Sequence, residues 1–120
     1  MMIREDLLLI VGEDATHLFD FFGVDELHGL NRRDCERRIS EGGTYIDGMC
    51  NQVPGSTSHF IFINKSALRG DAIRSYALVF HEATHYAFET YWDSLREDEE
   101  KLISLAEQVA IEICEKIGIK

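Results

Sequence analysis

Residues 71–92 read DAIRSYALVFHEATHYAFETYW, and this run holds no Gly or Pro. Apolar side chains recur along it at helical spacing: Ile73, Ala77, Phe80, Ala87, Phe88 and Tyr91. Asp71 is a suitable N-cap, because its carboxylate can accept hydrogen bonds from the first free backbone N–H groups of a helix. The run therefore predicts one long buried helix.

The middle of this helix contains the pentapeptide HEATH at residues 81–85. Two imidazoles four positions apart lie on one face of a helix, where both can reach one metal ion. The pattern predicts His81 and His85 as zinc ligands and Glu82 as the general base for a metal-activated water. The competing interpretation makes the two histidines polar core residues and Glu82 a solvated helix charge. That interpretation leaves buried polar groups that are costly to satisfy.

The segments on both sides of the motif predict what packs against its helix. Residues 44–50 and 59–64 have the composition of strands, and the turn residues of NQVPGSTS at 51–58 separate them, so a β-hairpin precedes the motif helix. After a polar break, residues 98–117 predict a second helix that ends at Gly118. The short connection makes the two helices an antiparallel pair.

The first forty residues predict a strand within 7–11 and short helices at 14–22 and 31–39. We expect these pieces to cover one side of the core. The predicted fold is α+β, with a small β-sheet or hairpin packed on the motif helix and an antiparallel C-terminal helix. Residues 1–120 are long enough for a single domain.

Composition restricts the class of protein. With 45% hydrophobic and 28% charged residues the chain is ordinary for a globular protein, and its net charge of −10 argues against binding to nucleic acid or to an anionic membrane. The apolar run at 7–11 is too short for a membrane span or a signal peptide, so we expect a cytoplasmic protein. Cys35, Cys50 and Cys114 are odd in number and lack metal-binding spacing, which predicts reduced thiols.

A catalytic zinc usually takes three protein ligands, so two histidines leave one ligand to find. A metzincin would carry a histidine six residues after His85, but position 91 is Tyr. His59 opens the predicted strand at 59–64 and would more naturally border the cleft. The second helix offers three glutamates instead: Glu99, Glu100 and Glu107. Simple antiparallel register, counted from a turn near residue 95, favours Glu107.

HEATH, the glutamate that follows it after fourteen intervening residues, and the preceding strand HFIFIN resemble one family of enzymes. They are the small, gluzincin-type, zincin-like metallopeptidases of phages and mobile elements, distantly similar to the ImmA/IrrE group. The resemblance covers about residues 60–110. It implies a minimal zincin-like domain, and it implies Glu100 as the third ligand, since Ile103 follows it three residues later, with Glu107 and Glu99 as alternatives.

The expected function is a zinc-dependent metallopeptidase with one Zn²⁺ per chain and a peptide or protein substrate. The strand at 59–64 can hold an extended substrate by edge pairing. An additional oxyanion donor is expected from among four residues: His59, Tyr45, Tyr86 and Tyr91. The alternatives are a degenerate zincin that binds zinc and a partner protein without turnover, and a helical domain with no metal.

Overall fold

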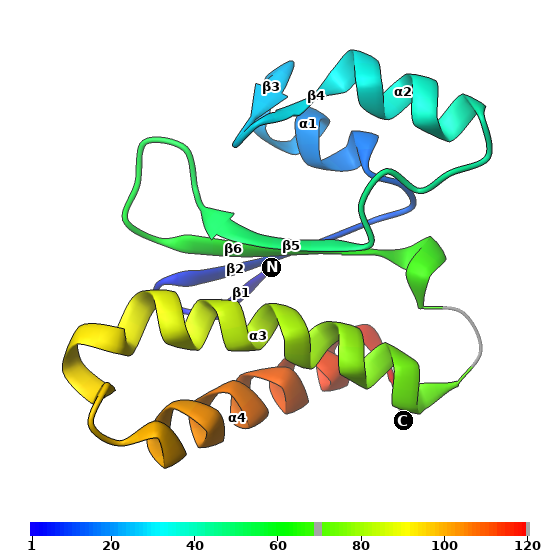
Figure 1. The fold of residues 1–120 in the computed structure, drawn as a ribbon. Helices are drawn as coiled ribbons and strands as arrows, with labels where there is room; N and C mark the ends of the chain where they lie inside the picture. Colours follow the sequence, from blue (N-terminus) through cyan, green and yellow to red (C-terminus); the bar gives the residue numbers. More distant parts are fainter. Residues whose placement is uncertain (69–70, 120) are drawn as a thin grey trace.

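A four-stranded mixed sheet lies at the centre of the protein (Figure 1). The structure is a computed structural model that describes residues 1–68 and 71–119. In the order β1-β2-β6-β5, the hairpin of β1 (Met2–Arg4) and β2 (Leu7–Gly12) is antiparallel, and β2 runs parallel to β6 (His59–Asn64). The predicted second hairpin is present, because β5 (Gly48–Gln52) pairs antiparallel with β6.

Two long helices pack as an antiparallel pair on one face of this sheet (Figure 1). α3 spans Ala72–Leu95 and α4 spans Glu99–Ile117. The side chains of Asp71 and Asp98 accept hydrogen bonds from backbone N–H groups of the first turns, and Gly118 ends α4 in a left-handed conformation. α3 runs past its expected end at residue 92 because no Gly or Pro interrupts the following residues. Within the described ranges, no helix combines the length and apolarity needed to cross a bilayer.

The segment between β2 and β5 covers the opposite face of the sheet (Figure 1). It contains α1 (Thr16–Phe22), the two short strands β3 (Glu26–Leu27) and β4 (Leu30–Asn31), and α2 (Arg32–Ser40). The Arg32 guanidinium, 2.6 Å from a carboxylate oxygen of Asp20 and 3.0 Å from one of Asp25, joins α2 to the end of α1 and the loop after it. The two predicted short helices therefore cover one side of the core, whereas the strand predicted within residues 7–11 lies inside the sheet as β2.

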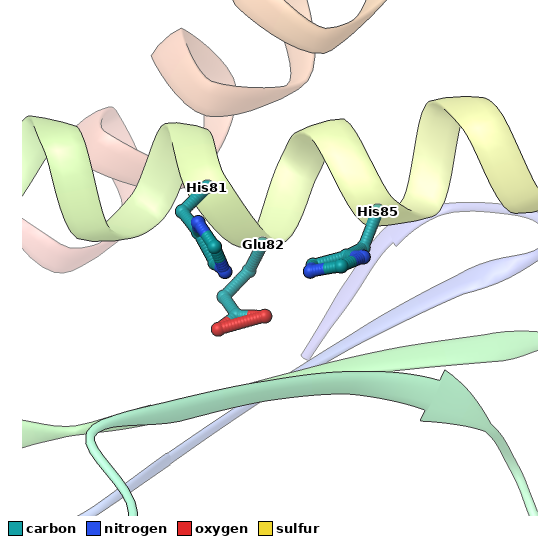
Figure 2. A group of neighbouring side chains, drawn as sticks. All are labelled: His81, Glu82 and His85. Atoms are coloured by element: carbon teal, nitrogen blue, oxygen red, sulfur yellow. The ribbon is translucent and has the colours of Figure 1, made fainter.

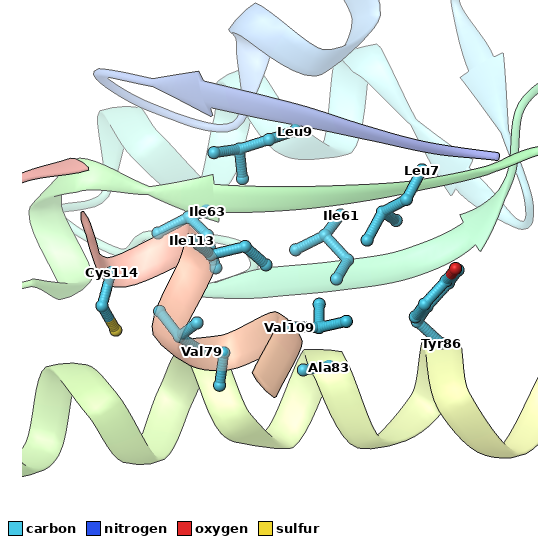
Figure 3. Packing of buried hydrophobic residues seen from close by; sticks show 11 residues of the cluster. Leu7, Leu9, Ile61, Ile63, Val79, Ala83, Tyr86, Val109, Ile113 and Cys114 are labelled. Carbon is cyan, nitrogen blue, oxygen red and sulfur yellow. The ribbon is translucent and has the colours of Figure 1, made fainter. Parts of the chain in front are cut away.

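The core divides into two clusters because alternate residues of the central strands point to opposite faces. One face packs against α3 and α4, and Figure 3 shows strand residues of this cluster: Leu7, Leu9, Ile61 and Ile63. The other face packs against α1 and α2 through Ile10, Phe60 and Phe62. The two central strands are thus buried on both sides, and α3 packs on one face of them.

The α+β class is confirmed, and the predicted apolar face of α3 is correct in part, since Ala87 is buried and Tyr91 packs against the core. Ile73 is 82% exposed and Ala77 is exposed, whereas Val79 and Tyr86 are fully buried. Apolar and aromatic side chains surround most of this helix, so their spacing does not single out one face. The sheet and α4 select the face that carries Val79 and Tyr86, and this face also carries Glu82.

Candidate metal centre

Three side chains in the middle of α3 form a possible metal-binding triad: His81, Glu82 and His85. One ligand atom from each lies within 4.8 Å of the others, and the two imidazole rings are 4.9 Å apart between centroids. Figure 2 shows all three projecting from α3 on the side that faces the sheet, whereas α4 lies on the other side of the helix. Both histidines are exposed, but Glu82 is only 5% exposed.

Glu82 is buried in the space between α3 and the edge strand β5. A methyl group added at Gly48 would come within 2.9 Å of Glu82 Oε2, so the glycine leaves the room that the carboxylate occupies. Burial raises the pKa of Glu82 above its ordinary value; the nearby His81 and His85 lower it and the charge of Glu89 raises it. A carboxylate with a raised pKa accepts a proton more readily, as a general base must.

A buried asparagine fixes the strand beneath this carboxylate. The Asn64 side chain donates to the backbone oxygen of Ile46 at 3.0 Å, and Asn64 N–H donates to the backbone oxygen of Asp47 at 2.9 Å. These bonds hold the chain that leads into β5. β6 lies between β2 and β5, so the prediction that residues 59–64 hold a substrate by edge pairing is wrong. The strand at the sheet edge beside the triad is β5.

A second group of side chains adjoins the triad, one helical turn further along α3. Glu89 Oε1 lies 3.6 Å from His85 Nδ1, and Glu89 Oε2 lies 3.7 Å from Nε2 of His59, which is 6% exposed. Burial raises the pKa of the Cys50 thiol, and the charges of Glu89 and Glu82 raise it further, so this half-buried side chain of β5 is held as a neutral thiol. Sequence reasoning missed Glu89, although its spacing of four residues from His85 indicates contact.

The predicted oxyanion donors other than His59 have different partners. Tyr86 donates its hydroxyl proton to Asp6 Oδ1 at 2.7 Å, and the Tyr91 hydroxyl lies 3.4 Å from Asp6 Oδ2. The Tyr45 hydroxyl accepts from the backbone N–H of Asn31, and its ring packs in the cluster on the opposite face of the sheet. The tyrosines therefore stabilise the fold and do not supply a free donor at the triad.

The structure does not bring the predicted third ligands to the triad. Three glutamates of α4 are exposed and lie outside the donor group found in the described ranges: Glu99, Glu100 and Glu107. The physical reason is that α3 continues to Leu95, roughly 15 Å beyond His85 at the helical rise, before the chain reverses. In addition, α4 packs on the side of α3 that faces away from the triad (Figure 2). The charge of Glu107 acts instead on Tyr76, whose pKa is raised first by burial and then by this glutamate.

The two imidazoles of the triad nevertheless suit a transition-metal ion such as zinc, which binds histidine nitrogen. A marked surface hollow lies elsewhere, beside Arg32 and Arg33, but Arg32 is already paired with two aspartates, so donor chemistry and not the hollow locates the candidate centre. Comparison of the chain with protein-family models, with curated proteins and with solved structures finds no match. The functional argument therefore rests on the residues themselves.

Proposed function

We propose that this protein is a zinc-dependent metallopeptidase. His81 and His85 would hold one zinc ion per chain, and Glu82 would act as the general base. One observation carries the proposal: a buried carboxylate lies beside two exposed imidazoles, with a ligand atom of each group within 4.8 Å of the others. A site that only clamps zinc needs no buried acid next to its ligands.

The chemistry follows from the environment of each group. Bound zinc would supply Lewis acidity, which polarises a peptide carbonyl and makes water a nucleophile at neutral pH. Glu82 takes a proton from the attacking water and returns one to the amine that leaves when the peptide bond breaks. Burial between α3 and β5 raises the pKa of Glu82, which favours the protonated carboxyl that forms after Glu82 has taken the proton from water.

The adjacent sheet edge suggests how a peptide is held. β5 (Gly48–Gln52) pairs with β6 on one side, and its other side carries no strand among the described residues. An extended peptide can add to such an edge through main-chain hydrogen bonds, which recognise the backbone and not a particular side chain. Gly48 lies in this strand against Glu82, so a peptide on β5 would pass the general base.

The alternative function is a zinc-binding interaction module without turnover. The specific observation in its favour is the exposure of the ligands: the His85 side chain is 50% exposed, and no α4 glutamate joins the donor group in the described part of the chain. Such an open site can accept a side chain from a partner protein as a further zinc ligand. Burial of Glu82 favours the peptidase.

Elemental analysis of protein purified without added metal tests the metal centre first. We expect about one zinc per chain, lost in His81→Ala and retained in Glu82→Gln. Glu100→Gln and Glu107→Gln should bind zinc as wild type does, because neither side chain reaches the triad. Absence of zinc from wild-type protein, both as purified and after incubation with added zinc and removal of the excess, would exclude both proposed functions.

Hydrolysis is tested separately with a mixed peptide pool analysed by mass spectrometry. Wild type should cleave peptides in a zinc-dependent manner, Glu82→Gln should lose cleavage while keeping zinc, and Glu115→Gln should retain activity as a matched control on an exposed site of α4. An active Glu82→Gln variant would refute the assigned base. Zinc binding by wild type without cleavage of any peptide would favour the interaction module.

A further inference from the structure

Glu89 contacts two histidines that come from different elements. Its Oε1 lies 3.6 Å from Nδ1 of His85 on α3, and its Oε2 lies 3.7 Å from Nε2 of His59 at the start of β6. Both distances are close polar contacts, slightly longer than a hydrogen bond. The Glu89 side chain is 46% exposed, so it has room to move closer to either imidazole. We call this arrangement the Glu89 bridge.

The His85 imidazole has two ring nitrogens, and the one that faces Glu89 leaves the other free to bind a metal. With Nδ1 directed to the carboxylate, Nε2 is left as the donor on the side of His81. A histidine ligand commonly directs its second ring nitrogen to a carboxylate, which fixes the tautomer and the ring orientation and makes the donor nitrogen more basic. Glu89 is placed to do this for His85.

His59 in turn restrains Glu89. It is 6% exposed, its backbone N–H donates to the backbone oxygen of Asp6 at 2.9 Å, and its ring lies edge-on to Tyr86 at 6.2 Å between centroids. The second ring nitrogen, Nδ1, lies 3.5 Å from the hydroxyl of Thr90. The His59 imidazole is therefore held by the sheet and α3 together. Contact with this fixed ring restricts the rotamers of the Glu89 side chain, which an exposed glutamate would otherwise sample freely.

We propose that Glu89 is a positioning residue of the metal centre, which orients His85 for metal binding and is itself held in place by His59. The proposal rests on the zinc site of the proposed function but does not require turnover. It assigns to His59 a role through Glu89, in place of the contact with substrate that the sequence suggested.

Zinc affinity, measured by competition with a chromophoric chelator, tests the bridge on the full-length chain. Glu89→Ala should weaken zinc binding by about 10- to 100-fold, as loss of such outer partners does. Glu89→Gln should show a smaller loss, because its amide oxygen can accept a hydrogen bond from imidazole N–H but carries no charge. Glu115→Gln removes the same charge from an exposed position on α4 and should leave the affinity unchanged.

Two further readouts separate orientation from a general effect on stability. The cobalt-substituted protein should keep the intensity of its d–d absorption in Glu89→Gln, since Glu89 is not a ligand, and the metal-free variants should melt close to wild type because the side chain is half-exposed. His59→Gln should weaken zinc binding several-fold in the wild-type background and should have no further effect in Glu89→Ala, since His59 acts through Glu89.

Three results would overturn the proposal. The first is a zinc affinity of Glu89→Ala equal to that of wild type. The second is an equal loss of zinc affinity in Glu89→Gln and Glu115→Gln, which would show an effect of charge alone. The third is additive losses of zinc affinity when His59→Gln and Glu89→Ala are combined. Failure of the proposed function looks different. If wild type binds zinc, loses affinity in Glu89→Ala and cleaves no peptide, the role of Glu89 stands and the peptidase function is excluded. If wild type cleaves peptides and Glu89→Ala binds zinc as tightly as wild type, the peptidase function stands and the role of Glu89 is excluded.

Discussion

Replacement of Gly48 by alanine tests whether β5 leaves room for the Glu82 carboxylate, the proposed general base. The added methyl would lie 2.9 Å from Glu82 Oε2, 3.2 Å from Glu82 Cγ and 3.2 Å from Leu78 Cδ1, whereas ordinary contact begins at 3.4 Å. The Glu82 carboxylate must therefore move by about half an ångström. Gly48 is not among the residues with positive φ, so the alanine brings no backbone strain of its own.

The magnitude follows from two opposing terms. Alanine in place of a strand glycine stabilises by about 0.5–1 kcal/mol, chiefly by restricting the unfolded chain. Crowding of a packed site costs about 1–3 kcal/mol, at the lower end here because the end of a flexible side chain gives way. In wild type, Gly48→Ala should be neutral to destabilising by up to about 2 kcal/mol. In a Glu82→Ala background most of the clash disappears, and the same change should stabilise.

Urea unfolding of wild type, both single variants and the double variant measures this coupling without a substrate. We expect a coupling energy of at least about 1 kcal/mol between positions 48 and 82. Additivity of the two changes within about 0.5 kcal/mol would refute the close approach of Gly48 to Glu82. For catalysis, a displaced base should lower turnover by about tenfold and leave zinc affinity unchanged.

Three other outcomes follow from the buried groups. Burial raises the folded-state pKa of Glu82 above its unfolded value, so stability is lost as pH rises from about 4.3, the ordinary glutamate pKa, to the raised folded pKa. Metal-free Glu82→Gln should therefore melt above wild type at pH 7 and match it below about pH 4; a wild-type advantage at pH 7 would contradict this. Tyr86→Phe removes the 2.7 Å hydrogen bond to Asp6 and should cost about 1.5–3 kcal/mol in urea unfolding without changing zinc affinity; an undiminished free energy of unfolding would contradict the structural role. Burial raises the pKa of Cys35 to about 11, so iodoacetamide should alkylate it slowly at pH 8 in the folded protein and rapidly in urea, as mass spectrometry would show; equal rates would count against its burial.

The parts of the fold that could be predicted are those that short stretches of sequence determine. Asp71 and Gly118 carry capping preferences, and the structure places each at the helix end that it predicted. β1 and the parallel pairing of β2 with β6 were not predicted. Pairing between strands that are distant along the chain depends on how the intervening helices pack, and short apolar runs do not encode it.

The site divides in the same way. His81, Glu82 and His85 were predicted because their spacing on one helix is itself the geometry. The burial of Glu82 was not, since it depends on the strand that carries Gly48. Register counting from the turn also did not show that α4 packs on the side of α3 away from the triad, because residue spacing gives height along a helix but not the side on which its neighbour lies.

The parallel pairing of β2 with β6 has a consequence for the order of folding. Leu7 pairs with His59 and Gly12 with Asn64, so these contacts close a long loop, whereas the α3–α4 hairpin is local in sequence. Local contacts generally form before distant ones. We expect the imidazoles of His81 and His85 to be brought together on the early helical hairpin, while Glu82 acquires its buried environment only after the sheet is complete. Under the proposed function, a folding chain would be able to bind metal before it can hydrolyse a peptide, because the buried environment of Glu82 depends on the completed sheet.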